Sequence, residues 1–199
     1  MNFTSISEKI ILLEREDSKL RNELIKKGTL SKGYNKEMET LHNRNAKELS
    51  LIMDSHGYPT SDKVGKEAGE AAWLIIQHSI GQPDFIKKCA VLLKEAVDEN
   101  KEDPKYLAYL TDRIAVFEGK PQLYGTQFDW DESGKMNPNP FDDLLKVNHR
   151  RRSIGLNTLE DQIKVMRERV KSENQHPPKN FEVRKQEFDE WRKTVGWIK

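Results

Sequence analysis

The sequence predicts a mainly α-helical protein, a bundle-like single domain with one small β-hairpin after the fifth helix. Apolar residues recur every three or four positions through most of the chain, which is the period of an α-helix. Only the stretch 122–138 alternates with a period of two around a turn, as a hairpin does. The composition agrees, because 35% hydrophobic and 34% charged residues in a chain of 199 suit a globular protein with long charged helices. We expect residues 1–175 to form the domain and residues 176–199 a C-terminal helical extension.

The helices are predicted over residues 5–27, 34–55 and 62–80, then from residue 83 onward and over 104–117. A capping box of Ser5 and Glu8 predicts the start of the first helix. Gly28 and Gly33 flank the turn that follows it, and Gly57 suits the end of the second helix.

Small residues are frequent in the third predicted helix, so we expect close packing there and place this helix at the centre of the bundle. The fourth begins at Pro83, and the fifth at Asp103 followed by Pro104. Cys89 lies on the apolar face of the fourth helix, which predicts a buried and unreactive thiol.

Strand-forming residues alternate over 123–130, and the turn sequence DESGK follows them. In a regular strand, Tyr124 and Gln127 would point to opposite faces. Both can serve one site only if Gly125 bends or bulges the strand, a place where glycine is often found. Beyond the hairpin, a short helix is predicted around the basic cluster HRRR, then a helix capped by Asn157 and an amphipathic C-terminal segment.

Charge and composition exclude several classes of partner. The 34 basic and 33 acidic residues nearly balance, so no broad field attracts nucleic acid or anionic lipid. The single cysteine excludes a disulfide framework within the chain. No apolar stretch suits a signal peptide or a membrane span. We expect a cytoplasmic protein without nucleic acid or membrane as a partner.

Polar side chains fall on apolar helix faces in three of the predicted helices. In the second helix, His42 and Asn45 continue the stripe of Met38 and Leu49. A buried imidazole or amide needs a partner, because an unsatisfied one costs about 1–3 kcal/mol. A slight rotation of the helix, with Leu41 inward and His42 at the edge, explains the pattern equally well.

In the third helix the stripe of Ala71 and Ile75 leads to His78, with Gln77 beside it. His78 stands in the last turn, where the helix dipole favours a protonated imidazole. Capping of the terminal carbonyls is the alternative explanation for this histidine.

In the fifth helix, Asp112 lies among apolar neighbours and has no basic partner on its own helix face. Such a carboxylate points into a pocket or pairs with a group from another element, and a purely structural ion pair is the alternative. Arg113 is adjacent and can reach the same cleft from the side.

Familiar catalytic and cofactor motifs are absent from the sequence. It has no phosphate-binding glycine-rich loop, no HExxH and no CxxC pair. His42, His78 and Asp112 could converge as metal ligands in a helical bundle. Because the helices lack the many glutamates of a di-iron site, we expect no metal and no other cofactor.

Four segments, HGYPT, VGKEAGEAAWLIIQHS, YLAYLTDRIAVFEGKPQLYGTQF and RRSIGL, occur in an order that resembles an uncharacterised bacterial family known only as a domain of unknown function. The resemblance covers roughly residues 34–170, and its pattern has tryptophan where this chain has Tyr58. It implies a common fold unit and a set of motif residues, but no activity. The matching positions are Gly57, Tyr58, Pro59, Val64, Gly65, Gln77, His78, Asp112, Arg113, Pro121, Gln122, Tyr124, Gly125, Thr126 and Gln127.

The predicted function is to bind or process a small polar or anionic molecule in a shared polar pocket. His78 is the candidate general base, Asp112 orients it, and Arg113 holds an anionic group. The other candidate ligand-binding residues are Gln77, Gln122, Tyr124, Gln127, His42 and Asn45. Catalysis is left open. The alternative is a protein-interaction module of the immunity or regulatory type, without catalysis, whose C-terminal extension binds a protein partner.

Overall fold

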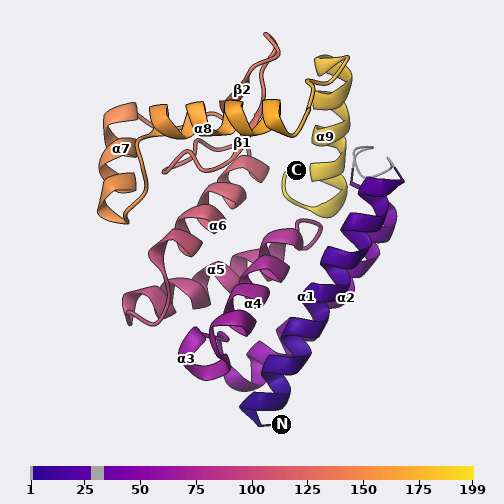
Figure 1. Cartoon of the computed structure of the whole chain (residues 1–199), viewed down its shortest axis with the longest axis vertical. Coiled ribbons are helices and arrows are strands. Elements are labelled where there is room, and N and C mark those ends of the chain that lie inside the picture. The colour runs from indigo at the N-terminus through magenta and orange to yellow at the C-terminus, as the bar shows by residue number, and fades with distance from the viewer. Residues whose placement is uncertain (1, 28–33) are drawn as a thin grey trace. The chain divides into compact units, whose positions relative to one another are not determined.

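The computed structural model describes residues 2–27 and 34–199 (Figure 1). The chain is mainly helical, with a small antiparallel hairpin after the sixth helix, so the predicted fold class is confirmed. The described chain divides into two units, residues 2–103 and 104–199. The expected turn between Gly28 and Gly33 lies outside the described residues. None of the described helices is long and apolar enough to cross a bilayer.

The first unit is entirely helical in its regular structure. Its helices are α1 (Phe3–Lys26), α2 (Lys36–His56), α3 (Ser61–Val64), α4 (Lys66–His78) and α5 (Pro83–Asp98). Helix α1 packs against α2, α3 and α4, and Figure 1 shows α1 and α2 side by side. Their facing stripes of isoleucine, leucine and alanine form the core of this unit. The site described below lies within this packing.

Two predicted boundaries in this unit are wrong. The side chain of Asn2, not Ser5, caps α1 by accepting a hydrogen bond from the Ser5 backbone N–H at 2.9 Å. The predicted third helix is two helices, because Gly65 interrupts it with a φ of 81°, a conformation that L-residues with side chains rarely adopt. The hairpin therefore follows the sixth helix rather than the fifth.

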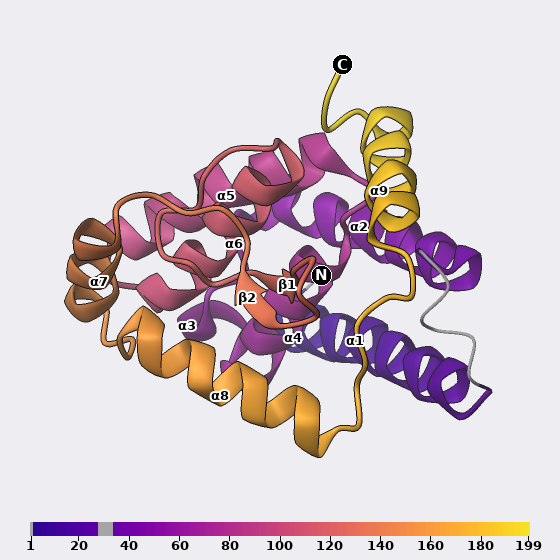
Figure 2. The same ribbon diagram turned by 90° about the horizontal axis from the view of Figure 1, so that it is seen from above.

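The second unit combines helices with the hairpin. Its elements are α6 (Pro104–Phe117), β1 (Phe128–Trp130), β2 (Met136–Pro138), α7 (Leu144–Ser153), α8 (Leu159–Ser172) and α9 (Phe181–Val195). The two strands pair antiparallel with Asp129 opposite Asn137. Helix α8 packs on β2 and on α7 (Figure 2). Helix α8 is capped by Thr158, whose side chain accepts from the Asp161 N–H, and not by Asn157 as the sequence suggested.

The regular strand is shorter than predicted. Residues 122–127 form a loop in which Gln122 makes one isolated bridge with Phe141, and the antiparallel ladder of the hairpin begins at Phe128. Gly125 has a φ of 62°, and a Cβ atom there would lie 2.8 Å from Leu159 Cδ1. The backbone at Gly125 therefore departs from an extended conformation, as expected. The strand β1 itself has only three residues.

Helix α9 is attached to the second unit by aromatic packing. The Phe117 ring lies 5.6 Å from that of Trp191 and 5.0 Å from that of Trp197, centroid to centroid. The Arg192 guanidinium donates to the Phe117 carbonyl at 3.0 Å, which satisfies a free carbonyl at the end of α6. The division into residues 1–175 and 176–199 stays a prediction.

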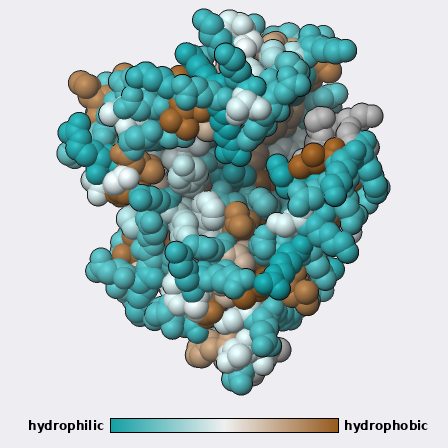
Figure 3. Space-filling view, viewed as in Figure 1, coloured by the Kyte–Doolittle hydropathy of each residue, from teal (hydrophilic) through white to brown (hydrophobic). Residues whose placement is uncertain are grey.

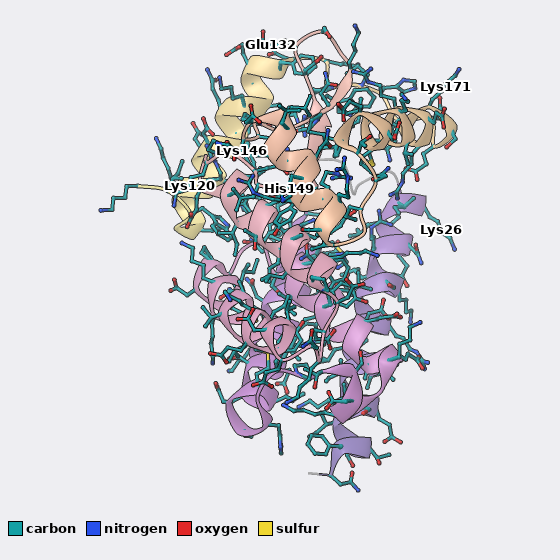
Figure 4. The ribbon with its side chains drawn as sticks, turned by 90° about the vertical axis from the view of Figure 1, so that its left-hand side faces the viewer. Lys26, Lys120, Glu132, Lys146, His149 and Lys171 are labelled. Carbon is teal, nitrogen blue, oxygen red and sulfur yellow. The ribbon has the colours of Figure 1, made fainter. Side chains whose placement is uncertain are left out.

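Charged groups cover most of the surface. Hydrophilic residues dominate the face in Figure 3, with hydrophobic patches between them. Glu132 and Lys171 lie at the edge of the second unit, and both are exposed (Figure 4).

Candidate functional site

A buried carboxylate joins two histidines in the first unit. Asp17 Oδ2 lies 2.8 Å from His78 Nδ1, and Asp17 Oδ1 lies 3.3 Å from His42 Nε2. The two imidazole centroids are 5.4 Å apart. We call these three side chains the Asp17 cluster.

Three helices supply the Asp17 cluster. Asp17 comes from the middle of α1, His42 from α2, and His78 from the last turn of α4. Because α1 packs on both other helices, the polar atoms meet where the three apolar faces converge. Asp17 and His42 are almost fully buried, while 35% of the His78 side chain is exposed. The cluster therefore reaches solvent through His78.

Tyr34 closes the cluster on the far side of His42. Its hydroxyl lies 2.7 Å from His42 Nδ1, and it also donates to the His78 backbone carbonyl at 3.4 Å. The Tyr34 and His42 rings stack with 5.7 Å between centroids. Both nitrogens of the His42 ring thus face a polar group, which fixes the orientation of the ring.

The ionisation of the cluster follows from its contacts. Burial by itself would raise the pKa of Asp17, but the hydrogen bonds from His42 and His78 prevail and lower that pKa well below its ordinary value. Burial, aided by the negative charges of Glu39 and Asp17, raises the pKa of Tyr34 far above its ordinary value. Asp17 is therefore a carboxylate and Tyr34 a neutral hydroxyl at neutral pH.

Asn45 and Gln77 lie near these residues in the sequence and are buried, as the helical pattern predicted. The Asn45 amide donates to the Leu13 carbonyl at 3.0 Å and accepts from the Arg44 guanidinium. This contact ties α2 to α1, one turn of α1 before Asp17. In the structure, Asn45 supports the packing that presents His42.

In the second unit, Asp112 organises the loop 122–127. Its carboxylate accepts from the backbone N–H groups of Leu123, Tyr124 and Thr126 at 2.8–3.2 Å, and from the Thr126 hydroxyl at 3.0 Å. Burial raises the pKa of Asp112, although these hydrogen bonds act in the opposite direction. Both carboxylate oxygens accept hydrogen bonds from backbone N–H groups and a hydroxyl, so Asp112 holds the loop by these contacts rather than by the ion pair considered from the sequence.

The two glutamines of the loop bind its backbone. Gln122 is fully buried, donates to the carbonyls of Gln127 and Asn139, and accepts from the Gln127 N–H at 2.7 Å. The Gln127 amide donates to the Thr126 hydroxyl at 3.1 Å and weakly to the Tyr109 carbonyl. These contacts replace the strand ladder that the loop lacks.

Arg151 completes the support of this loop. It is 2% exposed and donates to the Tyr124 carbonyl at 2.8 Å and to both the backbone and side-chain oxygens of Asn157. The basic cluster HRRR is therefore divided, because His149 is exposed on α7 (Figure 4) while Arg151 is a core residue. Arg113 is half-buried, and burial lowers its pKa to about 10.

Sequence reasoning missed Asp17, Tyr34 and Arg151. Asp17 had a usable signal, because it continues the buried stripe of Ile10 and Leu13 by one more turn. That is the rule that identified His42. Tyr34 lies just before the start of α2, and Arg151 lies in the polar helix α7. Neither position belongs to an apolar stripe that would predict its burial.

The predicted site residues are thus distributed over two units. His42 and His78 meet in the first, and Asp112, Gln122, Tyr124 and Gln127 meet in the second. A pocket shared by His78 and Asp112 stays a prediction. Among the described residues, the Asp17 cluster is the group of histidine and acidic side chains whose donor atoms come close enough for one metal ion.

The hairpin and α9 form a second candidate site, a cleft of about 670 Å³ within the second unit. Aromatic side chains lie along it, and so do charged groups of both signs. The Arg184–Asp129 ion pair, at 2.8 Å, bridges its two walls. Its aromatic residues are Trp130, Phe181 and Phe188.

Comparison with known proteins identifies the family and no activity. Neither the curated proteins nor the solved structures contain a significant match to this chain. Residues 7–172 match a family described as "Family of unknown function (DUF6624)", and this match spans α1 to α8. The resemblance seen in the sequence is confirmed at that level, and the chain belongs to the DUF6624 family of unknown function.

Proposed function

We propose that this protein binds a small polar or anionic molecule at the Asp17 cluster. The observation that carries the proposal is the convergence of one carboxylate and two imidazoles in the core, with His78 half-exposed at the boundary to solvent. Purely structural polar groups are usually satisfied inside a core, whereas this group leaves one ring edge accessible. A ligand can therefore reach the cluster without unfolding the helices.

The roles in this proposal differ from those expected from the sequence. Asp17 takes the orienting role that was assigned to Asp112, because its carboxylate contacts the His78 ring directly. His78 is the residue that meets the ligand, and His42 with Tyr34 lines the inner wall.

A thermal-shift screen with small polar and anionic compounds tests this proposal. A ligand at about 100 times its Kd stabilises the protein by about 2.7 kcal/mol, which gives a measurable rise in Tm. The rise should disappear in His78→Gln and persist in His56→Gln. His56 is a matched control, since it is a half-buried histidine of the same unit that contacts Phe3 instead of the cluster. A ligand that stabilises both variants equally contradicts the proposal.

The cleft beside α9 supports a second candidate function, binding of a peptide segment of a partner protein. Val183 and Phe188 remain exposed on α9, although Trp191 and Trp197 are used in packing within the chain. A photo-crosslinking residue at position 185, which lines the cleft, should give one discrete adduct in cells, and Phe188→Asp should abolish it. Adducts that survive Phe188→Asp count against this second function.

A further inference from the structure

We infer that the Asp17 cluster holds a divalent transition-metal ion, with Asp17, His42 and His78 as its three protein ligands. This inference deepens the proposed function, because it names the group that would bind the polar molecule at that site. One ligand atom from each residue lies within 4.8 Å of the other two. Ligands about 2.0–2.2 Å from a common ion lie roughly 3–4 Å apart, so side-chain shifts of about 1 Å complete the site.

The donor set selects the class of ion. Two imidazole nitrogens and one carboxylate oxygen suit zinc, iron, cobalt and nickel, whereas magnesium and calcium prefer oxygen ligands only. Three protein ligands leave at least one coordination position open, which is the arrangement of catalytic rather than structural zinc sites. The exposed edge of His78 places that open position on the solvent side.

The hydrogen bonds of Tyr34 support the same assignment. When the hydroxyl donates to the His78 carbonyl, it accepts from His42 Nδ1–H. In the neutral ring, the lone pair on His42 Nε2 then faces Asp17 Oδ1 across 3.3 Å, whereas a protonated ring donates its Nε2–H to the same oxygen. A metal ion between Nε2 and Oδ1 satisfies both atoms in the neutral case, and 3.3 Å is long for a charge-assisted hydrogen bond but usual for two ligands of one metal.

Tyr34 is accordingly a positioning residue for the metal. Histidine ligands commonly donate their second N–H to a neighbouring oxygen, which fixes the tautomer and the ring orientation. Loss of such a partner typically weakens metal binding about 10–100-fold. Glu39, whose charge acts on Tyr34, adds a second negative group near the site.

Zinc titration of the chelator-treated full-length protein tests the inference. We expect one equivalent of Zn²⁺ to bind with a Kd of about 1 μM or tighter by calorimetry, and Mg²⁺ not to compete. His78→Gln should weaken binding at least about 100-fold, and His56→Gln should bind like the wild type. Co²⁺ should give a visible absorption band that requires His78.

Tyr34→Phe keeps all three ligands and removes only the hydroxyl, so it separates a metal site from a simple hydrogen-bond network. The inference predicts a Zn²⁺ affinity about tenfold or more lower in this variant. It is overturned if the wild type takes up no zinc, or if His78→Gln binds zinc as tightly as the wild type. An unchanged affinity in Tyr34→Phe removes its positioning role.

The outcomes also separate this inference from the proposed function. The ligand screen is run with zinc and again with chelator. A compound that stabilises the wild type equally in chelator supports the small-molecule site and shows that the compound does not bind through the metal, while the zinc titration alone decides whether the metal binds. Zinc binding without any stabilising compound supports the metal and contradicts the small-molecule function.

Discussion

Individual buried polar side chains hold together the Asp17 cluster in the first unit and the loop 122–127 in the second. Asp17, Asp112 and Arg151 are each at most 2% exposed, and each contacts several partners from other segments. Such residues are expensive to bury and so require complete hydrogen bonding. Asp17 differs from the other two, because its partners are two imidazole rings, one of which, His78, reaches solvent, whereas Asp112 and Arg151 bind mainly backbone groups.

Asp112→Asn should lower the free energy of unfolding by about 3 kcal/mol. The amide has the same shape, but its NH₂ group must face at least one of the N–H donors of Leu123, Tyr124 and Thr126. Urea denaturation followed by circular dichroism measures the loss. Thr126→Val removes the hydroxyl contacts with Asp112 and Gln127 but keeps the backbone N–H donors, and it should cost about 1 kcal/mol, so equal losses in both variants would contradict the assigned role.

Cys89 should resist modification in the native protein. It is fully buried in α5, and burial raises the pKa of its thiol to about 12. Since the thiolate is the reactive form, iodoacetamide at pH 8 should label it only when the protein is unfolded in denaturant. Rapid stoichiometric labelling without denaturant, read by mass spectrometry, would show that the thiol is accessible.

At the scale of elements, the apolar stripes of the sequence predicted the helices well, but the segments that connect the helices were predicted less well. Apolar period alone located α2, α5 and α6 closely, because those helices bury one continuous face. It could not show that Gly65 divides α3 from α4, since the apolar stripe continues across the break. Nor could it distinguish a strand from the loop 122–127, whose alternating residues are held by the distant side chains of Asp112 and Arg151.

Gly125→Ala should destabilise the protein more than Gly196→Ala. Both glycines have positive φ, at 62° and 90°, so both substitutions carry a backbone cost of about 1–2 kcal/mol. Only at Gly125 does the new Cβ collide with Leu159, and crowding of this kind adds about 1–3 kcal/mol. Thermal denaturation of both variants measures the difference.

A double-mutant cycle assigns the origin of that difference. Leu159→Ala shortens the side chain that the new Cβ meets, so the two substitutions should couple by about 1 kcal/mol or more in the favourable direction. If the losses in free energy of unfolding from Gly125→Ala and Leu159→Ala simply add, the destabilisation by Gly125→Ala comes from the backbone conformation alone.

At the scale of the whole molecule, the residues predicted from the sequence to form one site are divided between the two units. The sequence identified His42 and His78 as inward-facing but paired them with Asp112, because helical periodicity indicates burial and not which helices meet. The partner that the structure supplies is Asp17, since α1 packs against both α2 and α4. Contacts between helices depend on the three-dimensional arrangement, which one sequence does not encode in any local pattern.

Zinc should alter the two units differently. If the Asp17 cluster binds the ion, α1, α2 and α4 gain a shared ligand, and their amides should exchange with deuterium more slowly. Peptides from residues 104–199 should show a smaller change. Hydrogen–deuterium exchange with mass spectrometry, with His78→Gln as the control, measures both, and slowing confined to the second unit would place the ion elsewhere.

The loop 122–127 also has a consequence for synthesis of the chain on the ribosome. Its hydrogen bonds come from Asp112 on one side and from Arg151 on the other, and Arg151 follows Tyr124 by 27 residues. The helix that carries Asp112 is already outside the ribosome while the loop emerges, but Arg151 is still enclosed in the exit tunnel. The nascent loop therefore reaches its final conformation only after α7 has emerged from the ribosome. A translational pause before α7 emerges would prolong the exposure of the loop to proteases.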